Sequence, residues 1–124
     1  MSDTDQRQAA QRRGHSSESW AALWLRLKGY RILARRLKTR AGEIDLVAAA
    51  PFGPVCFIEV KARAQARIAA ESVGENQQTR IARAASLYLA SRPQLSCRGS
   101  RFDIVAIAPR RLPVHHRDVW RPEI

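Results

Sequence analysis

The sequence predicts a single α/β domain in which helices flank a mixed β-sheet. Two segments space their apolar residues as amphipathic helices do, and four shorter segments show the alternation or the β-branched apolar runs of strands. These segments follow in the order helix, three strands, helix, strand, and the last three have the lengths of a crossover unit, which joins parallel strands. A chain of 124 residues, of which 45% are hydrophobic, can form one packed core without disulfides or a structural metal.

The predicted domain begins with a helix of about three turns that starts at residue 16. Ser16 or Ser17 can cap its start, and Gly29 follows its last turn as a left-handed stop. Four large apolar residues fall at helical spacing and are expected to face the core: Trp20, Leu23, Trp24 and Leu27. The preceding residues are polar and aperiodic, so residues 1–15 are expected to form a disordered N-terminal segment.

Three strands are predicted after this helix. The first covers residues 30–37, where apolar and basic residues alternate imperfectly. The next two are EIDLVAA at 43–49 and VCFIEVKAR at 55–63, separated by a turn with two prolines and one glycine. Two neighbouring extended runs with such a short connection are typical of an antiparallel hairpin.

The second half of the chain predicts one helix and one strand. No element is assigned to residues 63–74, and the helix is expected over 75–91. Its apolar spacing comes from Ile81, Ala84, Ala85, Tyr88 and Leu89. RFDIVAIA at 101–108 is the last clear strand, so the α/β domain is expected to span 16–108. Three prolines in residues 109–124 predict a C-terminal tail without long regular structure.

The charge of the chain points to a polyanionic partner. Lys and Arg number 22 against 11 Asp and Glu, which gives a net charge of +11. The stretch from Arg26 to Arg40 holds seven basic residues and no acidic one. Nucleic acid is favoured over a membrane surface because no helix pairs a basic face with a long apolar one. The candidate phosphate contacts are Arg35, Arg36, Lys38 and Arg40. The alternative is a solvated basic loop.

Several classes of protein are disfavoured by the sequence. No apolar stretch is long enough for a membrane span, and the first residues lack the apolar region of a secretory signal. Two cysteines, Cys56 and Cys97, cannot build a disulfide framework or a cysteine-based zinc site. These observations predict a cytoplasmic protein without a membrane partner.

Three charged side chains in the predicted hairpin are candidates for catalysis. Asp45 and Glu59 each lie inside an otherwise apolar strand, where carboxylates are rare without a stabilising partner. Alternation along the strand places Asp45 on the opposite face from Ile44 and Leu46, and it gives Glu59 and Lys61 a common face. Two carboxylates on a rigid sheet suit Mg²⁺ or Mn²⁺, and a nearby lysine can stabilise charge at an attacked phosphorus. The alternative is a solvated Glu-Lys ion pair on an exposed strand face.

Other polar or aromatic residues have simpler interpretations. Asp103 lies in an apolar strand, and pairing with a neighbouring arginine would account for it. His115 and His116 are adjacent, so in an extended chain they point to opposite sides and make a poor metal pair. Trp20 and Trp24 are more typical of a helix core than of a base-stacking platform.

The segments GEIDLVA at 42–48 and FIEVKAR at 57–63 resemble the YraN-like family of bacterial proteins. That family is similar to restriction-endonuclease-like nucleases, and especially to archaeal Holliday junction resolvases. The resemblance also covers the predicted helices and the last strand, over residues 14–108. It implies a three-layer restriction-endonuclease-like fold with a mixed sheet flanked by helices.

The same resemblance implies roles for individual residues. Asp45 and Glu59 would be the metal ligands, Lys61 the catalytic lysine and Glu18 a further acidic group near the metal. Gln78 would be an accessory polar residue facing the site, with a solvated helix residue as the alternative. For Glu18 the alternative is a first-turn acid that favours the helix dipole. The chain departs from the family pattern at Gln77, where many members have lysine, and in its proline-rich tail.

The function implied is a Mg²⁺- or Mn²⁺-dependent endonuclease that hydrolyses phosphodiester bonds in DNA, with branched or structured DNA suggested by the fold analogy alone. A second hypothesis is a non-catalytic nucleic-acid-binding protein with the same fold. A third is an interaction protein whose charge serves an acidic partner. The sequence leaves the oligomeric state open, a homodimer included.

Overall fold

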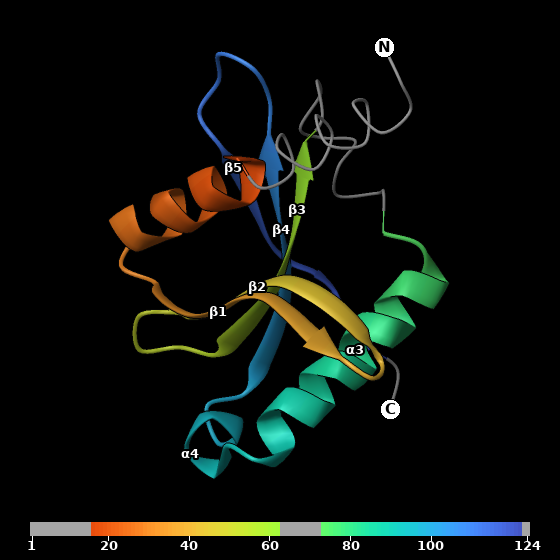
Figure 1. Ribbon diagram of the computed structural model, residues 1–124. Coiled ribbons are helices and arrows are strands. Elements are labelled where there is room, and N and C mark those ends of the chain that lie inside the picture. Colours follow the sequence, from red (N-terminus) through yellow and green to blue (C-terminus); the bar gives the residue numbers. More distant parts are fainter. Residues whose placement is uncertain (1–15, 63–72, 123–124) are drawn as a thin grey trace.

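A computed structural model describes residues 16–62 and 73–122 and confirms the predicted α/β class (Figure 1). The predicted N-terminal segment 1–15 lies outside the described residues, as does most of the unassigned stretch after β3. The described chain is helical over residues 16–27 and then forms β1 (Arg31–Thr39), β2 (Gly42–Ala49), β3 (Val55–Ala62), α3 (Glu75–Ala90), α4 (Pro93–Ser96), β4 (Ser100–Ile107) and β5 (Val114–Trp120). None of these helices has the length and apolarity needed to cross a bilayer.

The five strands form one mixed sheet in the order β1-β2-β3-β4-β5. The β2–β3 hairpin is antiparallel, as predicted, and so are the β1–β2 and β4–β5 pairs. Strands β3 and β4 are parallel and are joined through α3, which confirms the predicted crossover unit. The acidic residues of interest on β2 and β3 therefore lie on adjacent strands of a rigid sheet.

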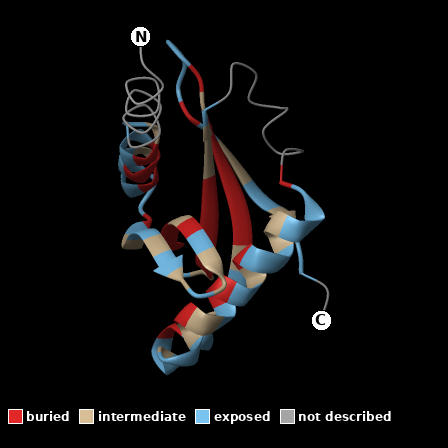
Figure 2. Cartoon of the chain, turned by 45° about the vertical axis from the view of Figure 1, so that its right-hand side comes forward, coloured by how far each residue is buried: buried red, intermediate tan, exposed pale blue. Residues whose placement is uncertain are grey.

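Helices cover both faces of the sheet, which makes three layers (Figure 2). One core cluster joins the sheet to α3 and α4 and includes Ile44, Val47, Phe57, Ile81, Ala84, Tyr88, Leu95 and Ile104. The other joins the opposite face to helix 16–27 and includes Ala21, Ala22, Leu25, Leu46, Ala48, Cys56, Ile58 and Val105. This arrangement is compatible with a three-layer restriction-endonuclease-like fold.

The first helix packs through a different face from the one predicted. Its fully buried apolar residues are Ala21, Ala22 and Leu25, whereas Leu23 is 43% and Leu27 71% exposed. Both tryptophans also lie outside the buried set, Trp20 exposed and Trp24 half-buried. The buried apolar face consists of two small side chains, Ala21 and Ala22, and one large one, Leu25. The prediction of a Trp/Leu core face is therefore wrong.

The C-terminal stretch also contains more structure than expected. Strand β5 pairs with β4, although the prolines predicted no long regular element beyond residue 108. Pro113 precedes the strand and Pro122 follows it, so neither removes a hydrogen-bond donor from within it. Trp120 stacks on Phe102 with ring centroids 4.1 Å apart. The strand is stabilised by this contact and by the polar network described next.

A buried polar network centred on Asp103 joins β4, β5 and the end of the first helix. Arg101 donates from Nε and Nη2 to the two Asp103 oxygens at 2.9 and 2.8 Å, which confirms the expected arginine partner. The Asp118 backbone N–H also donates to Asp103. Although burial acts to raise the pKa of Asp103, the hydrogen bonds from His115 and Arg101 outweigh it and lower that pKa to about 2. The carboxylate is therefore charged and fully partnered.

His115 extends this network to the surface. Its Nε2 lies 2.7 Å from Asp103 Oδ2, and its Nδ1 lies 2.7 Å from Lys28 Nζ. Because a lysine ammonium group can only donate, the ring accepts at Nδ1 and carries its proton on Nε2. Burial lowers the pKa of His115, which agrees with this neutral form. Both ring nitrogens are thus engaged, which agrees with the interpretation that adjacent histidines do not form a metal pair.

Candidate active site

Asp45 lies where the regular pairing of β2 with β3 ends. The ladder reaches only to Leu46, and beyond it the alternation of faces breaks: Ile44 packs in the same core cluster as Val47, on the α3 side. At this break Asp45 Oδ2 accepts a hydrogen bond from the Val60 backbone N–H at 2.8 Å. The side chain thus takes the place that a main-chain carbonyl would hold in the ladder. The predicted strict alternation over 44–48 is wrong here, and the irregularity directs Asp45 toward β3.

Glu59 extends from β3 toward α3, on the face that also carries Phe57. The residue is only 8% exposed. Gln77 Nε2, from the first turns of α3, donates to Glu59 Oε2 at 3.1 Å. The predicted common face of Glu59 and Lys61 follows from their spacing of two along a regular strand. Sheet and helix together fix the position of the Glu59 carboxyl group.

Asp45, Glu59 and Lys61 influence one another through their charges. Burial raises the pKa of Asp45 against the lowering effect of the Val60 hydrogen bond. Burial, and next the charge of Asp45, raise the pKa of Glu59 to about 8. The Lys61 charge lowers the pKa of both carboxyl groups without reversing either shift. The two acids therefore share a buried setting in which a second negative charge is costly at neutral pH.

This pairing predicts a pH-dependent stability. The usual pKa of Glu59 is 4.5, and in the folded protein it rises to about 8. Between these values the folded state binds more protons than the unfolded state, so the free energy of unfolding falls as pH rises. In EDTA at pH 8 we expect the free energy of unfolding of Glu59→Gln to exceed that of the wild type by at least ~1 kcal/mol. This difference corresponds to roughly 4 °C in Tm. Below pH 4.5 the two should converge, because Glu59 is then protonated in both states.

Thermal melts at several pH values, followed by circular dichroism, would measure this difference. Glu75→Gln, on the exposed start of α3, is the matched control and should melt like the wild type throughout. A Glu59→Gln variant no more stable than the wild type at pH 8 would contradict the raised pKa.

Glu18 is buried beside this pair but is already partnered. It is 4% exposed, and its oxygens lie 2.9 Å from Arg35 Nε and 3.5 Å from Arg36 Nε. Its charge contributes to the raised pKa of Asp45, so it lies near the site. Two of the four predicted phosphate contacts are thus bound to Glu18. The other two, Lys38 and Arg40, are exposed at the β1–β2 hairpin.

Of the two adjacent glutamines on α3, Gln77 bonds to Glu59, whereas Gln78 bonds to the main chain. Gln78 Nε2 donates to the Val73 carbonyl at 2.9 Å and so fixes the chain just before α3. Adjacent helical residues point about 100° apart, so the two side chains leave α3 in different directions. The sequence named Gln78 as the accessory residue and marked position 77 only as a departure from the family pattern, so the Gln77–Glu59 bond was missed.

The donor set suits a hard cation with a hydrated shell. Among the residues that the structure describes, no group of three or more His, Cys, Asp or Glu side chains converges on one point. A closed zinc site is therefore not formed by this part of the chain. Mg²⁺ binds through one or two carboxylates and keeps several waters, so Asp45 with Glu59 is an adequate protein contribution.

Comparisons with known proteins agree with the resemblance noted in the sequence. Residues 17–107 match the uncharacterised protein family UPF0102. A UPF0102 protein of Paramagnetospirillum magneticum is 55% identical over 118 residues, which cover 92% of this chain and 91% of that protein. One of Agrobacterium fabrum is 51% identical over 94% of this chain and 95% of its own length. This chain therefore belongs to UPF0102, the YraN-like family.

Proposed function

We propose that this protein hydrolyses phosphodiester bonds in DNA with Mg²⁺ or Mn²⁺ held by Asp45 and Glu59. The observation that carries the proposal is the buried carboxyl pair, whose pKa values are both raised. Such a pair lowers the stability of the metal-free fold at neutral pH, and a divalent cation would relieve the repulsion between the two charges. A purely structural role would be served better by one acid or by none.

Each residue of the site has a role in this proposal. The bound ion would lower the pKa of a coordinated water and neutralise charge at the attacked phosphate. Asp45 is held in place by Val60 and Glu59 by Gln77, so both carboxylates are oriented before the ion binds. Lys61, whose charge acts on both carboxyl groups, would supply a positive charge for the attacked phosphate group or for the attacking water.

The charge of the chain supports DNA as the substrate. The net charge is +11, and Lys38 and Arg40 are exposed on the hairpin that leads into β2. Binding should therefore weaken steeply with salt, because association releases counterions from the DNA. A preference for branched or structured DNA is part of the proposal on the basis of the family resemblance alone.

The direct test is incubation of the purified protein with supercoiled plasmid, linear duplex and four-way DNA, in Mg²⁺, Mn²⁺ or EDTA. We expect nicking or cleavage with either cation and none in EDTA. Filter binding in EDTA across a salt series would be measured on the same DNA. Binding without cleavage under every metal condition would instead support the non-catalytic DNA-binding hypothesis. Salt-independent binding, or none, would favour an interaction protein with an acidic partner.

A further inference from the structure

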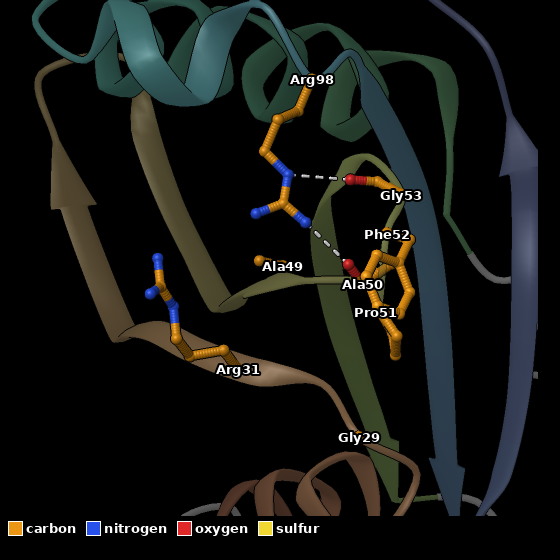
Figure 3. A pocket seen from close by; sticks show the side chains of 8 residues that line it. All are labelled: Gly29, Arg31, Ala49, Ala50, Pro51, Phe52, Gly53 and Arg98. Atoms are coloured by element: carbon orange, nitrogen blue, oxygen red, sulfur yellow. Dashed lines mark hydrogen bonds between the residues drawn. The ribbon is translucent and has the colours of Figure 1, made fainter.

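A second feature of the molecule lies at the opposite end of the β1–β2 pair from its connecting turn. It is an open pocket of about 540 Å³ (Figure 3). Its walls come from the start of β1, the β2–β3 turn and the segment after α4, and consist of Gly29, Arg31, Ala49, Ala50, Pro51, Phe52, Gly53 and Arg98. Two residues of this lining are basic and none is acidic. Neither core packing nor the candidate active site explains why this pocket has two arginines and no acidic residue.

The two arginines make the pocket a site for an anion. Arg98 is held in place because its Nε donates to the Gly53 carbonyl at 2.9 Å and its Nη2 to the Ala50 carbonyl at 2.7 Å. Its remaining nitrogen points to the side where the Arg31 guanidinium group lies (Figure 3). Arg31 is exposed and forms no ion pair with the residues the structure describes. Two guanidinium groups over one cavity, without a carboxylate in its lining, suit a phosphate group.

Phe52 supplies a stacking surface at the edge of the same pocket. Its side chain is fully exposed, and its backbone φ of 52° is one that large residues rarely adopt. Such a conformation is strained for a large residue, and an exposed ring returns no core packing to offset the strain. Fold stability alone would favour glycine or asparagine at this turn position. An exposed aromatic ring beside a phosphate site is instead typical of proteins that stack an unpaired base.

The pocket lies within reach of the acidic pair. Arg31 pairs with Ala49 at the end of β2, and Asp45 lies four residues earlier on that strand. At about 3.3 Å per residue the separation is roughly 13 Å. This length corresponds to about four nucleotide steps at the ~3.4 Å rise of a DNA strand. One strand could therefore occupy both places at once.

We infer that this pocket binds an unpaired nucleotide of a DNA strand, with its phosphate between Arg31 and Arg98 and its base against Phe52. The identity of the strand as DNA rests on the function proposed above. Within a duplex every base is stacked and paired, so it is unavailable to the Phe52 ring. The substrate class is then DNA with an unpaired nucleotide a few steps from the bond that is cleaved.

Fluorescence anisotropy in EDTA would test this inference without any contribution from cleavage. The probes are a labelled single strand, the matching duplex and a single strand of equal length that lacks bases. We expect Phe52→Ala to weaken single-strand binding about 10-fold, within the 1–3 kcal/mol per stacked base found for such contacts. The same variant should leave duplex and base-free strand affinity within about twofold of the wild type, because neither offers an unpaired base.

Arg31→Gln tests the phosphate contact. It should weaken single-strand binding and lower the salt dependence by about one released counterion. Matched controls come from the β4–β5 connection, where Leu112→Ala removes an apolar residue that is 66% exposed and Arg111→Gln removes an exposed charge. Melting temperatures would show that all four variants are folded.

The inference is overturned if Phe52→Ala weakens single-strand binding no more than Leu112→Ala does. An equal loss on the base-free strand would also overturn it, because stacking could not then be the cause. These results are independent of the proposed catalysis. A protein that binds single strands through Phe52 but never cleaves DNA would refute the nuclease function and leave the nucleotide pocket supported.

Discussion

Asp45→Asn and Glu59→Gln are each expected to reduce metal-dependent DNA cleavage by at least ~100-fold, the effect of losing a group that positions charge in the reacting complex. Each substitution removes one negative charge from the proposed metal site while keeping the shape of the side chain. An asparagine oxygen can still accept the Val60 N–H, and a glutamine oxygen can still accept the Gln77 amide. The fold should therefore survive, and initial cleavage rates in Mg²⁺ would measure the loss.

Binding to the same DNA separates a catalytic role from a structural one. We expect affinity in EDTA to stay level or to increase, because neither variant adds negative charge to a site that faces a polyanion. Asp118→Asn and Glu75→Gln are matched controls at exposed positions, and both should cleave at the wild-type rate. Wild-type cleavage by Glu59→Gln would exclude this carboxylate as a metal ligand.

Asp103→Ala is expected to cause the largest loss of stability. The variant leaves Arg101, with a side chain only 18% exposed, and the buried His115 without their shared acceptor. Breaking a buried, hydrogen-bonded charge pair from one side costs about 3–5 kcal/mol, a large part of the 5–15 kcal/mol that typically stabilises a domain. Urea unfolding followed by tryptophan fluorescence would measure the change, and we expect β5 to separate from β4 first.

An exposed pair provides the control for this prediction. Asp118 and Arg121 lie 2.8 Å apart at the surface, where water screens their attraction, so the pair contributes little to stability. Arg121→Ala, which removes the 81% exposed partner, should therefore unfold close to the wild-type urea concentration. If Asp103→Ala did the same, the buried network would not be what holds β5 in the sheet.

Much of the fold could be predicted because the central strands are buried and helix α3 is amphipathic. The β2–β3 hairpin, helix α3 and the parallel β4 all follow from local periodicity, which tertiary packing then reinforces. The first helix was predicted with the wrong face, because hydrophobic size alone did not show that Ala21 and Ala22 permit the closest approach to the sheet. Strand β5 was missed because its partners, Asp103 and Phe102, are distant in sequence.

The candidate site was predictable in its residues and not in its arrangement. Carboxylates are rare in apolar strands, so Asp45 and Glu59 could be predicted as site residues from the sequence. The break in alternation at Asp45 depends on where the β2–β3 ladder ends, which no local pattern encodes. Which glutamine of α3 reaches Glu59 depends on the rotation of that helix over the sheet, and no local pattern encodes the pairing of Glu18 with Arg35.

The main-chain bond accepted by Asp45 has a consequence for interpreting relatives of this protein. A member that had lost all enzymatic ability would still need an acceptor at this position, since the Val60 amide would otherwise be left unsatisfied. Selection for a sound sheet can thus preserve Asp45, or replace it with Asn, in relatives that do not carry out the proposed hydrolysis. The Gln77 bond at Glu59 could be accepted equally well by a glutamine, so an acid retained at this position is the better marker of relatives that keep the proposed metal site.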